Sequence, residues 1–383
     1  MDPLPIKDIP TRALVVEEPN SAFELRDVIL DEVRPREVLV QMKYTGICHT
    51  DLAVRQGAMP IGSFPAVLGH EGAGVIRRLG ADVQGLQVGD HVLLSFASCM
   101  DCPRCHEGQK GVCAQITRIN FGGARGLEES PIRLPDGRRV RGQFFGQSSF
   151  SELSIVDVRS VVKYSGDEKD LSFLAPLGCG YMTGAGTIFN ELRPKAKSTI
   201  AIFGLGAVGL AAVMAAKYKA VNDIIAVDNV PAKLELALSV GAKHVIDSTK
   251  HTDIAQAIHG LYSDGVDYIM DTTGSSLLVN SGIKALGHAG TMALVGVFGP
   301  EDKLHVNALD LLTSCKSVVG IILGSADPQE LLPQLLEMVH AGSFPVNVMS
   351  KVYPAKEVNE AIADLKAGAV SLNHPTFAGY HSN

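Results

Sequence analysis

The tightest constraint on this 383-residue chain is a group of four cysteines with the spacing C-x2-C-x2-C-x7-C: Cys99, Cys102, Cys105 and Cys113. Thiolates this close in sequence can converge on one tetrahedral zinc ion, and a site closed by four sulfurs leaves no position for a substrate. Two disulfides or four separate core thiols are the alternatives. The total of seven cysteines is odd, and the N-terminal sequence MDPLPIKDIPTR lacks the apolar run of a signal peptide, which argues against a disulfide framework. The spacing therefore predicts a structural zinc lobe.

Composition excludes several classes of partner. Hydrophobic residues make up 46% of the chain and charged residues 20%, as in ordinary globular proteins. The formal net charge of −7 offers no basic field to nucleic acid or to an anionic membrane, and the short arginine group Arg138, Arg139 and Arg141 does not change this. No run approaches the roughly 18 apolar residues of a spanning helix. We therefore expect a cytoplasmic protein without nucleic-acid or membrane partners, long enough for two domains.

The chain up to about residue 164 alternates short β-type runs with turn signals. These runs are residues 37–44 (EVLVQMKY), 74–79, 91–95 and 154–158. They predict an all-β domain of the barrel kind that carries the cysteine lobe as an insertion. The Gly- and Arg-rich residues 121–150 are predicted to form a long loop with solvated arginines.

From about residue 197 the pattern changes to alternating strands and helices. Strands are predicted at 198–203, 223–227, 244–246, 266–270 and 291–297, and helices at 205–219 and 232–240. Repeated βα units predict a parallel, doubly wound sheet, so the fold class is α/β. After residue 325 the sequence predicts helices at 330–340 and 355–366 and a strand near 348–352, which we expect to fold back on the first domain.

The turn between the first of these strands and its helix carries the pattern G-x-G-x-x-G, formed by Gly204, Leu205, Gly206, Ala207, Val208 and Gly209. In this context the glycines allow a tight turn, close approach of a pyrophosphate and close helix packing. The helix N-terminus adds free N–H groups and a positive dipole end. Asp228 follows Gly209 by nineteen positions and ends the second strand, and no arginine occurs in residues 229–233. The pattern predicts NAD rather than NADP; a structural turn without a ligand is the alternative.

Three further cysteines lie outside the lobe: Cys48 in GICHTD, Cys179 in PLGCG, and Cys315. His70 and Glu71 stand side by side in GHEG. Two thiolates and one imidazole make the ligand set of an open zinc site, whose fourth position takes water or substrate. A core cysteine and a satisfied core histidine are common alternatives. Cys315 has no such neighbourhood and is predicted to be a core thiol.

The order and spacing of these motifs together resemble the zinc-dependent medium-chain alcohol dehydrogenases over nearly the whole chain. The shared elements are GICHTD at 46–51, GHEGAG at 69–74, the four-cysteine lobe, LGCG at 177–180, GLGAVG at 204–209 and Asp228. The resemblance implies a GroES-like β-barrel catalytic domain over residues 1–180 and a Rossmann NAD-binding domain with a doubly wound parallel sheet over 181–322. Residues 323–383 would return to the catalytic domain, and the active site would lie in the cleft between the domains.

The resemblance also implies roles for individual residues. Cys48, His70 and Cys179 match the ligands of a catalytic zinc, in addition to the structural zinc of the lobe. Glu71 matches an acid behind the metal, Thr50 the hydroxyl that takes the alcohol proton, and Asp51 the partner of the histidine ligand. This metal would lower the pKa of a bound alcohol, and the alkoxide carbon would deliver hydride to NAD.

Further cofactor contacts are implied for His49, Lys233 and Val297, beside the glycine turn and Asp228. The chain departs from some relatives at three places. His49 stands where some of them carry an arginine against the pyrophosphate, Ala53 where their proton relay ends in a histidine, and His374 where a basic residue precedes proline. These departures predict a weaker phosphate contact and a different exit for the proton.

Residues 142–150 (GQFFGQSSF) resemble the aryl- and benzyl-alcohol branch of the family. Phe96, Phe144 and Phe145 could line an apolar cleft, with core packing as the alternative for each. The resemblance implies a primary aromatic or allylic alcohol and its aldehyde as substrates, a role in secondary metabolism, and a homodimer or homotetramer. A zinc-free quinone or enoyl reductase on the same fold and a non-catalytic NAD-binding protein are the alternatives, and neither needs an open metal site.

Overall fold

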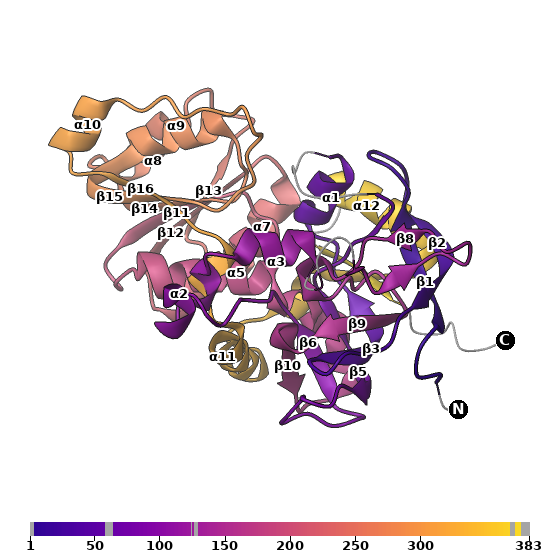
Figure 1. Cartoon of the computed structure of the whole chain (residues 1–383). Coiled ribbons are helices and arrows are strands. Elements are labelled where there is room, and N and C mark those ends of the chain that lie inside the picture. The colour runs from indigo at the N-terminus through magenta and orange to yellow at the C-terminus, as the bar shows by residue number, and fades with distance from the viewer. Residues whose placement is uncertain (1–3, 58–63, 124, 126–128, 368–371, 377–383) are drawn as a thin grey trace. The chain divides into compact units, whose positions relative to one another are not determined.

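The computed structural model describes residues 4–57, 64–123, 125, 129–367 and, by their backbone, 372–376 (Figure 1). The chain forms two compact units. The first comprises the chain up to Cys179 together with Asp327–Leu332 and the residues from Asn347 onward; the second comprises Gly180–Ala326 and Pro333–Val346. None of the helices in the described part of the chain is long and apolar enough to cross a membrane.

The first unit is built from two sheets. One has the strand order β4-β1-β2-β7-β8, with β1 at Ile9–Val16, β2 at Glu24–Leu30, β4 at Ala66–Val67, β7 at Ile132–Arg133 and β8 at Arg139–Val140. The other has the order β10-β6-β5-β3-β18-β17, and β9 also pairs with β3. Its strands are β3 (Glu37–Thr45), β5 (Gly72–Leu79), β6 (His91–Leu94), β9 (Leu153–Asp157), β10 (Val161–Tyr164), β17 (Ser350–Pro354) and β18 (Leu372–Thr376). The predicted strands at 37–44, 74–79, 91–95 and 154–158 are confirmed within two residues.

The C-terminal segment completes the second of these sheets. β18 pairs with β3 in antiparallel fashion and with β17 in parallel fashion, although more than 300 residues separate β3 from β18. The helix α12 (Val358–Lys366) lies between β17 and β18 in the chain and, like α11 (Pro328–His340), was expected from the sequence. The return of the last part of the chain to the first unit is therefore a pairing of strands.

The predicted loop at residues 121–150 is corrected by the structure. It contains the end of α3 (Ile116–Gly122) and the strands β7 and β8, and residues 140–150 are buried throughout. Arg125 is not solvated, because its guanidinium binds Glu37 at 2.6 Å and Asp31 at 2.9 Å. Arg141 is only 6% exposed, and burial lowers its pKa. Arg138 and Arg139 are exposed, as expected.

The second unit contains a six-stranded parallel sheet with the order β13-β12-β11-β14-β15-β16. This is the strand order 3-2-1-4-5-6 of a doubly wound dinucleotide-binding fold. The strands are β11 (Thr199–Phe203), β12 (Asp223–Asp228), β13 (His244–Asp247), β14 (Val266–Asp271), β15 (Leu286–Leu294) and β16 (Ser317–Gly320). The main helices are α6 (Ala207–Tyr218), α7 (Pro231–Val240), α8 (Ile254–Leu261), α9 (Ser276–Ala285) and α10 (Ala308–Thr313). The α/β fold class is confirmed.

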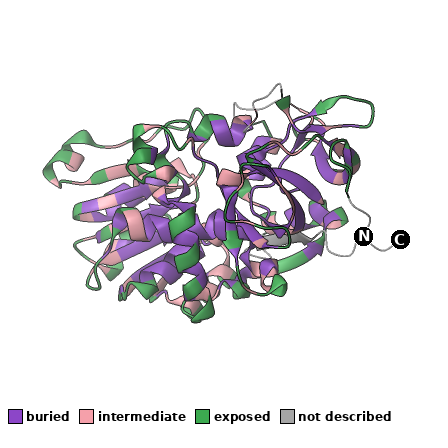
Figure 2. Ribbon diagram, turned by 60° about the horizontal axis from the view of Figure 1, so that its bottom comes forward, coloured by how far each residue is buried: buried purple, intermediate pink, exposed green. Residues whose placement is uncertain are grey.

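The apolar runs that predict these strands form the core of the second unit. Ala201, Phe203, Ile225, Val227 and Ile269 are at most 1% exposed. A strand of a parallel sheet covered by helices is buried on both faces, which explains why its sequence is continuously apolar. Most residues of β11, β12 and β14 are buried, as in the purple strands of Figure 2, whereas the helices of this unit also carry exposed residues.

Cys315 is exposed, so the prediction that it is a core thiol is wrong. It lies between α10 and β16 with a φ of 54°, and its sulfur is 3.9 Å from the carbonyl oxygen of Leu312. β16 is the last strand of the sheet and has a neighbour on one side only within the described structure. A turn residue at such an edge has little protein to cover it.

Candidate active site and metal centres

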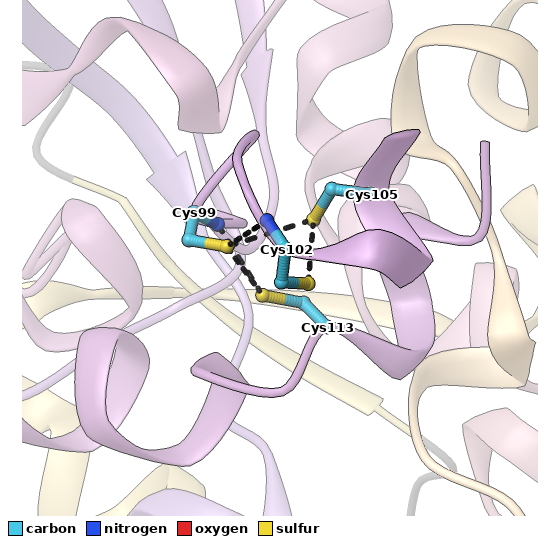
Figure 3. Close-up of side chains that lie close together, drawn as sticks. All are labelled: Cys99, Cys102, Cys105 and Cys113. Atoms are coloured by element: carbon cyan, nitrogen blue, oxygen red, sulfur yellow. Dashed lines mark hydrogen bonds between the residues drawn. The ribbon is translucent and has the colours of Figure 1, made fainter. Parts of the chain in front are cut away.

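The four cysteines of the lobe lie around one point, with their sulfurs turned toward each other (Figure 3). The sulfur separations are 3.8 Å for Cys99–Cys105, 3.6 Å for Cys102–Cys105 and 3.4 Å for Cys99–Cys113. Zinc–sulfur bonds of about 2.3 Å in a tetrahedron place the sulfurs about 3.8 Å apart. None of the seven cysteines of the chain is in a disulfide. The set fits one zinc ion with no open position.

Backbone amides around the lobe favour the ionised sulfurs that a metal needs. The amide of Cys102 donates to the Cys99 sulfur at 3.3 Å, and the amides of Cys99 and Gln115 donate to the Cys113 sulfur at 3.3 and 3.4 Å. Backbone N–H groups of Ala114 and Cys105 lower the pKa of Cys102 to about 6. The short helix α2 (Pro103–His106) and its flanking turns therefore arrange donors as well as sulfurs.

A second cluster brings together Cys48, His70, Glu71 and Cys179, all in the first unit. Cys48 caps α1 (His49–Arg55), His70 and Glu71 precede β5, and Cys179 follows a turn of 3-10 helix at Ala175–Gly178. One ligand atom from each lies within 4.8 Å of all the others. Glu71 reaches the cluster because residue 46 is glycine: a Cβ there would lie 1.9 Å from the Glu71 Oε2.

The imidazole of His70 is oriented by a buried carboxylate. The Oδ1 of Asp51 lies 3.1 Å from the Nδ1 of His70 and accepts the amide of Gly69 at 3.0 Å, while Oδ2 accepts the amide of Cys48 at 3.0 Å. The opposite nitrogen, Nε2, is buried and has no hydrogen-bond partner among the described residues. A histidine held at one nitrogen, with the other bare inside a cluster of thiols, fits a metal ligand.

The ionisation of the cluster also suits a metal. The hydrogen bond from the Cys179 thiol holds the pKa of Cys48 well below its usual value, and the same bond raises the pKa of Cys179. Burial works against a charge on His70, but the carboxylate of Asp51 and the thiolate of Cys48 outweigh it and raise the pKa of His70. Two thiols and an imidazole therefore share protons that a bound cation would displace.

Two phenylalanine rings contact the His70 imidazole, and a third packs against both of them. The ring of Phe145 stacks on it with centroids 4.6 Å apart and an interplanar angle of 28°, and Phe144 meets it edge-on at 5.4 Å. Phe121 of α3 contacts both phenylalanines, at 5.7 and 5.1 Å. The sequence analysis did not point to Phe121, because no local pattern connects the helix after the cysteine lobe with His70. Phe96 lies instead beside a separate cavity of about 80 Å³ that Lys110, Arg159 and Asp327 also line.

Thr50 and the other expected residues of α1 occupy its first turn. The Oγ1 of Thr50 is 3.8 Å from the sulfur of Cys48. His49 is exposed, whereas Asp51 is completely buried. Ala53 is 6% exposed, so the position where some relatives carry a histidine is an apolar, buried one here.

The glycine turn lies between β11 and α6 in the second unit, and each glycine has a distinct surrounding. Gly204 has a φ of 84°, and a Cβ there would lie 2.5 Å from the Oγ1 of Thr272. A Cβ at Gly209 would lie 1.9 Å from the carbonyl oxygen of Gly204, while a Cβ at Gly206 would have no described atom within 4 Å. This combination of a tight turn, an open approach and close packing matches the three roles of glycine in a pyrophosphate-binding turn.

Asp228 links the end of β12 to this turn. Its Oδ2 accepts the amide of Leu205 at 2.6 Å, and its Oδ1 accepts the amides of Asn229 and Val230 at 2.8 and 3.0 Å. A carboxylate has about four acceptor positions, so with three amides bound about one is left to accept a ribose hydroxyl. Three further residues expected at the cofactor lie at the N-termini of helices in the second unit. Ala207 and Val208 begin α6, and Lys233 lies in the first turn of α7. Val297, after β15, is 43% exposed.

Comparison with known proteins gives matches over both units. The alcohol dehydrogenase GroES-like domain matches residues 34–166, and the zinc-binding dehydrogenase family matches residues 207–341. Geraniol dehydrogenase of Castellaniella defragrans is 35% identical over 94% of this chain and 96% of its own length. S-(hydroxymethyl)glutathione dehydrogenase of Synechocystis is 31% identical over 92% of this chain and 95% of its own.

Solved structures of alcohol dehydrogenases also match this chain over nearly its whole length. The benzyl alcohol dehydrogenase of Acinetobacter calcoaceticus has a TM-score of 0.91 and 36% identity, over 96% of this chain and 99% of its own. An alcohol dehydrogenase zinc-binding domain protein from Burkholderia ambifaria has a TM-score of 0.91 and 39% identity, over 96% of this chain and 98% of its own. The GroES-like and Rossmann folds expected from the motifs are thus confirmed, and the chain belongs to the zinc-dependent medium-chain alcohol dehydrogenase family.

Proposed function

We propose that this chain is an NAD-dependent, zinc-containing dehydrogenase that interconverts a primary aromatic or allylic alcohol with its aldehyde. The observation that carries the proposal is the cluster of Cys48, His70 and Cys179, in which the last two are buried and no described residue hydrogen-bonds the Nε2 of His70. Two thiols and such an imidazole suit a zinc site with one position left for the alcohol or aldehyde oxygen. A zinc-free quinone or enoyl reductase would not need these three side chains together.

The surroundings of the cluster support an unsaturated substrate. Phe144 and Phe145 place apolar rings next to His70, and substrate sites are mostly apolar with a few polar anchors. One relative is named for geraniol, an allylic alcohol, and one structural neighbour for benzyl alcohol, an aromatic one. Such a substrate also agrees with the proposed role in secondary metabolism.

Several side chains of the first unit have proposed tasks in the reaction. Zinc supplies Lewis-acid polarisation of the substrate oxygen when it is bound by Cys48, His70 and Cys179. Asp51 holds the Nδ1 of His70 so that its Nε2 is available to the metal. The Oγ1 of Thr50 takes the proton of the alcohol, and Glu71 supplies a carboxylate beside the ligands. Because Ala53 is apolar, the proton leaves Thr50 without a side-chain relay at that position.

Residues of the second unit would hold the cofactor. We assign the pyrophosphate to the turn that contains Gly204, Gly206 and Gly209, with the first amides of α6 at Ala207 and Val208, and the adenosine ribose to Asp228. Lys233 and Val297 complete the proposed contacts on this unit, and His49 of the first unit stays a predicted cofactor contact.

Metal content combined with activity tests this proposal. The wild-type protein should contain two zinc ions per chain, and Cys48→Ser and His70→Ala should each contain one, held by the four-cysteine lobe. Both variants should keep the wild-type melting behaviour and NAD affinity but lose alcohol oxidation, measured over a panel of aromatic, allylic and aliphatic alcohols. Near-normal turnover by either variant without its second zinc would contradict the catalytic assignment. One zinc in the wild-type chain would favour a reductase or a non-catalytic protein.

We further propose that the chain forms a homodimer or homotetramer. β16 ends the parallel sheet of the second unit, and the helix before it exposes Leu309 and Leu312 by 67% and 75%. An edge strand with exposed apolar residues beside it is suited to pair with another copy. None of the seven cysteines is in a disulfide, which agrees with the proposed cytoplasmic location, where thiols stay reduced.

A further inference from the structure

Gln147 is completely buried and uses both ends of its side-chain amide on backbone groups next to the metal cluster. Its Oε1 accepts the amide of Gly72 at 3.0 Å. Its Nε2 donates to the carbonyl oxygens of His70 at 2.9 Å and of Ser95 at 3.0 Å. The side-chain amide therefore bridges the backbone of His70 and Gly72, on either side of Glu71. It also connects this segment to Ser95, which follows β6.

Ser95 extends this network to the other side of the cluster. The side chain of Ser95 is buried, and its hydroxyl donates to the carbonyl oxygen of Gly178 at 2.6 Å. Gly178 directly precedes Cys179 and lies so close to β6 that a Cβ there would be 1.9 Å from the carbonyl oxygen of Leu94. One continuous set of hydrogen bonds thus joins the backbone at His70 to the backbone at Cys179.

The main chain of Gln147 is itself fixed, so the amide is a rigid support. The backbone N–H of Gln147 donates to the carbonyl oxygen of Phe144 at 3.0 Å. The backbone carbonyl oxygen of Gln147 accepts a hydrogen bond from the hydroxyl of Ser154 on β9. The same short segment contains Phe145, whose ring stacks on His70. The segment therefore supports His70 through its backbone and through its ring.

From these contacts we infer that Gln147 is a positioning residue for the metal site, acting on His70 directly and on Cys179 through Ser95. The inference rests on the proposed function, because it assumes that Cys48, His70 and Cys179 bind zinc. Gln147 makes none of the contacts of a ligand; it fixes the separation of two ligands that lie more than 100 residues apart in sequence. Partners beyond the ligands typically change metal affinity by about 10- to 100-fold when they are removed.

The release of zinc from the intact enzyme tests this inference. In Gln147→Met the side chain keeps its length but makes none of the three hydrogen bonds. A chelator and a colour indicator follow the loss of both zinc ions, and the phase that is absent in Cys48→Ser belongs to the ion held by Cys48, His70 and Cys179. We expect Gln147→Met to release that ion about 10 to 100 times faster than the wild-type protein. The visible spectrum of the cobalt-substituted site should shift as well.

A matched control is available in the same unit. Asn120 is also a buried amide with three backbone partners, the amide of Ala97 at 2.8 Å and the carbonyl oxygens of Ala97 and Ile116 at 2.9 and 2.7 Å. Among the described residues its side chain hydrogen-bonds only Ala97 and Ile116 and none of His70, Gly72, Ser95 or Gly178, so Asn120→Leu should accelerate the release of the zinc held by His70 much less than Gln147→Met does. If Asn120→Leu and Gln147→Met accelerated that release equally, the effect would be general loosening and the inference would be overturned.

A milder variant covers the case in which Gln147→Met does not fold. Ser95→Ala removes only the hydrogen bond to Gly178, and we expect several-fold faster release of the same zinc ion with nearly native melting behaviour. Wild-type release rates in Ser95→Ala, or in a folded Gln147→Met, would overturn the inference while the proposed function stood. If the wild-type chain contained a single zinc ion, that result would instead contradict the proposed function.

Discussion

Asp228 sets the expected choice of cofactor at the scale of a single residue. A 2′-phosphate would meet its carboxylate at a place where residues 229–233 include no arginine. The repulsion and the lost ribose hydrogen bonds are worth about 2–4 kcal/mol, or roughly 30- to 1000-fold in kcat/KM. We expect a preference of that size for NAD, and Asp228→Gly combined with Asn229→Arg should narrow or reverse it. The measurement is kcat/KM for both cofactors with one alcohol.

The double variant needs a control for stability, because Asp228 also accepts the amide of Leu205. Its melting temperature and its zinc content should therefore be compared with those of the wild-type protein. Equal kcat/KM values for NAD and NADP in the wild type, or a preference for NADP, would show that the end of β12 does not select the cofactor.

Individual site residues differ in how well the sequence indicates them. Cys48, His70, Glu71 and Cys179 stand in short motifs, and the structure brings their ligand atoms within 4.8 Å of each other. Gln147 and Phe121 could not be singled out in this way, because the groups that their side chains contact lie 23 or more positions away and the backbone groups bound by Gln147 leave no trace in sequence. The exposure of Cys315 was mispredicted for the related reason that a lone cysteine does not reveal whether it lies at a sheet edge.

The glycine turn between β11 and α6 allows a matched pair of variants at the scale of an element. Gly206 has a φ of −75°, which alanine adopts readily, and its Cβ would meet no described atom within 4 Å. Gly206→Ala should therefore fold normally but crowd the pyrophosphate, raising the Kd of NAD about tenfold, or ~1.4 kcal/mol. The readout is a binding titration together with thermal melting.

Gly209→Ala should behave in the opposite way. Its Cβ would lie 1.9 Å from the carbonyl oxygen of Gly204, so the helix must shift away from the turn. Overpacking of this kind costs about 1–3 kcal/mol, which lowers the melting temperature by about 2–4 °C for each kcal/mol in a domain of this size. If Gly206→Ala proved the less stable of the two, the assignment of these glycines to approach and packing would be incorrect.

The sequence predicts a strand well where consecutive residues are apolar and buried. It predicts the structure poorly where a charged residue is buried by pairing with residues far away in the chain. β3, β11 and β12 have apolar runs that identify them, whereas β7 and β8 have two residues each and lie in an arginine-rich stretch. Arg125 is buried in that stretch because Glu37 and Asp31, 88 and 94 positions earlier, neutralise it. Composition alone cannot reveal such pairing, so the stretch resembles a solvated loop.

At the scale of the whole molecule, the edge of the second unit determines the expected oligomer. The burial of one leucine side chain is worth about 1.5–3 kcal/mol. Leu309→Glu with Leu312→Glu should therefore weaken association by roughly a hundredfold or more, and the protein should elute as a monomer at low micromolar concentration. Leu238→Glu is the control, since Leu238 is 45% exposed on α7 of the same unit and should not affect assembly. A wild-type protein that is monomeric by light scattering would rule out this interface.

The pairing of β18 with β3 has a consequence for the order in which the chain folds during synthesis. Residues 180–326, which contain all six strands of the parallel sheet, leave the ribosome as one nearly uninterrupted block. The larger sheet of the first unit, by contrast, remains incomplete until residues 372–376 have been made. Contacts between such distant parts of a chain form slowly, and incomplete sheets expose edges that aggregate. We therefore expect the parallel sheet of the second unit to form during synthesis before the sheet of the first unit, the unit that contains Cys48, His70 and Cys179, is complete.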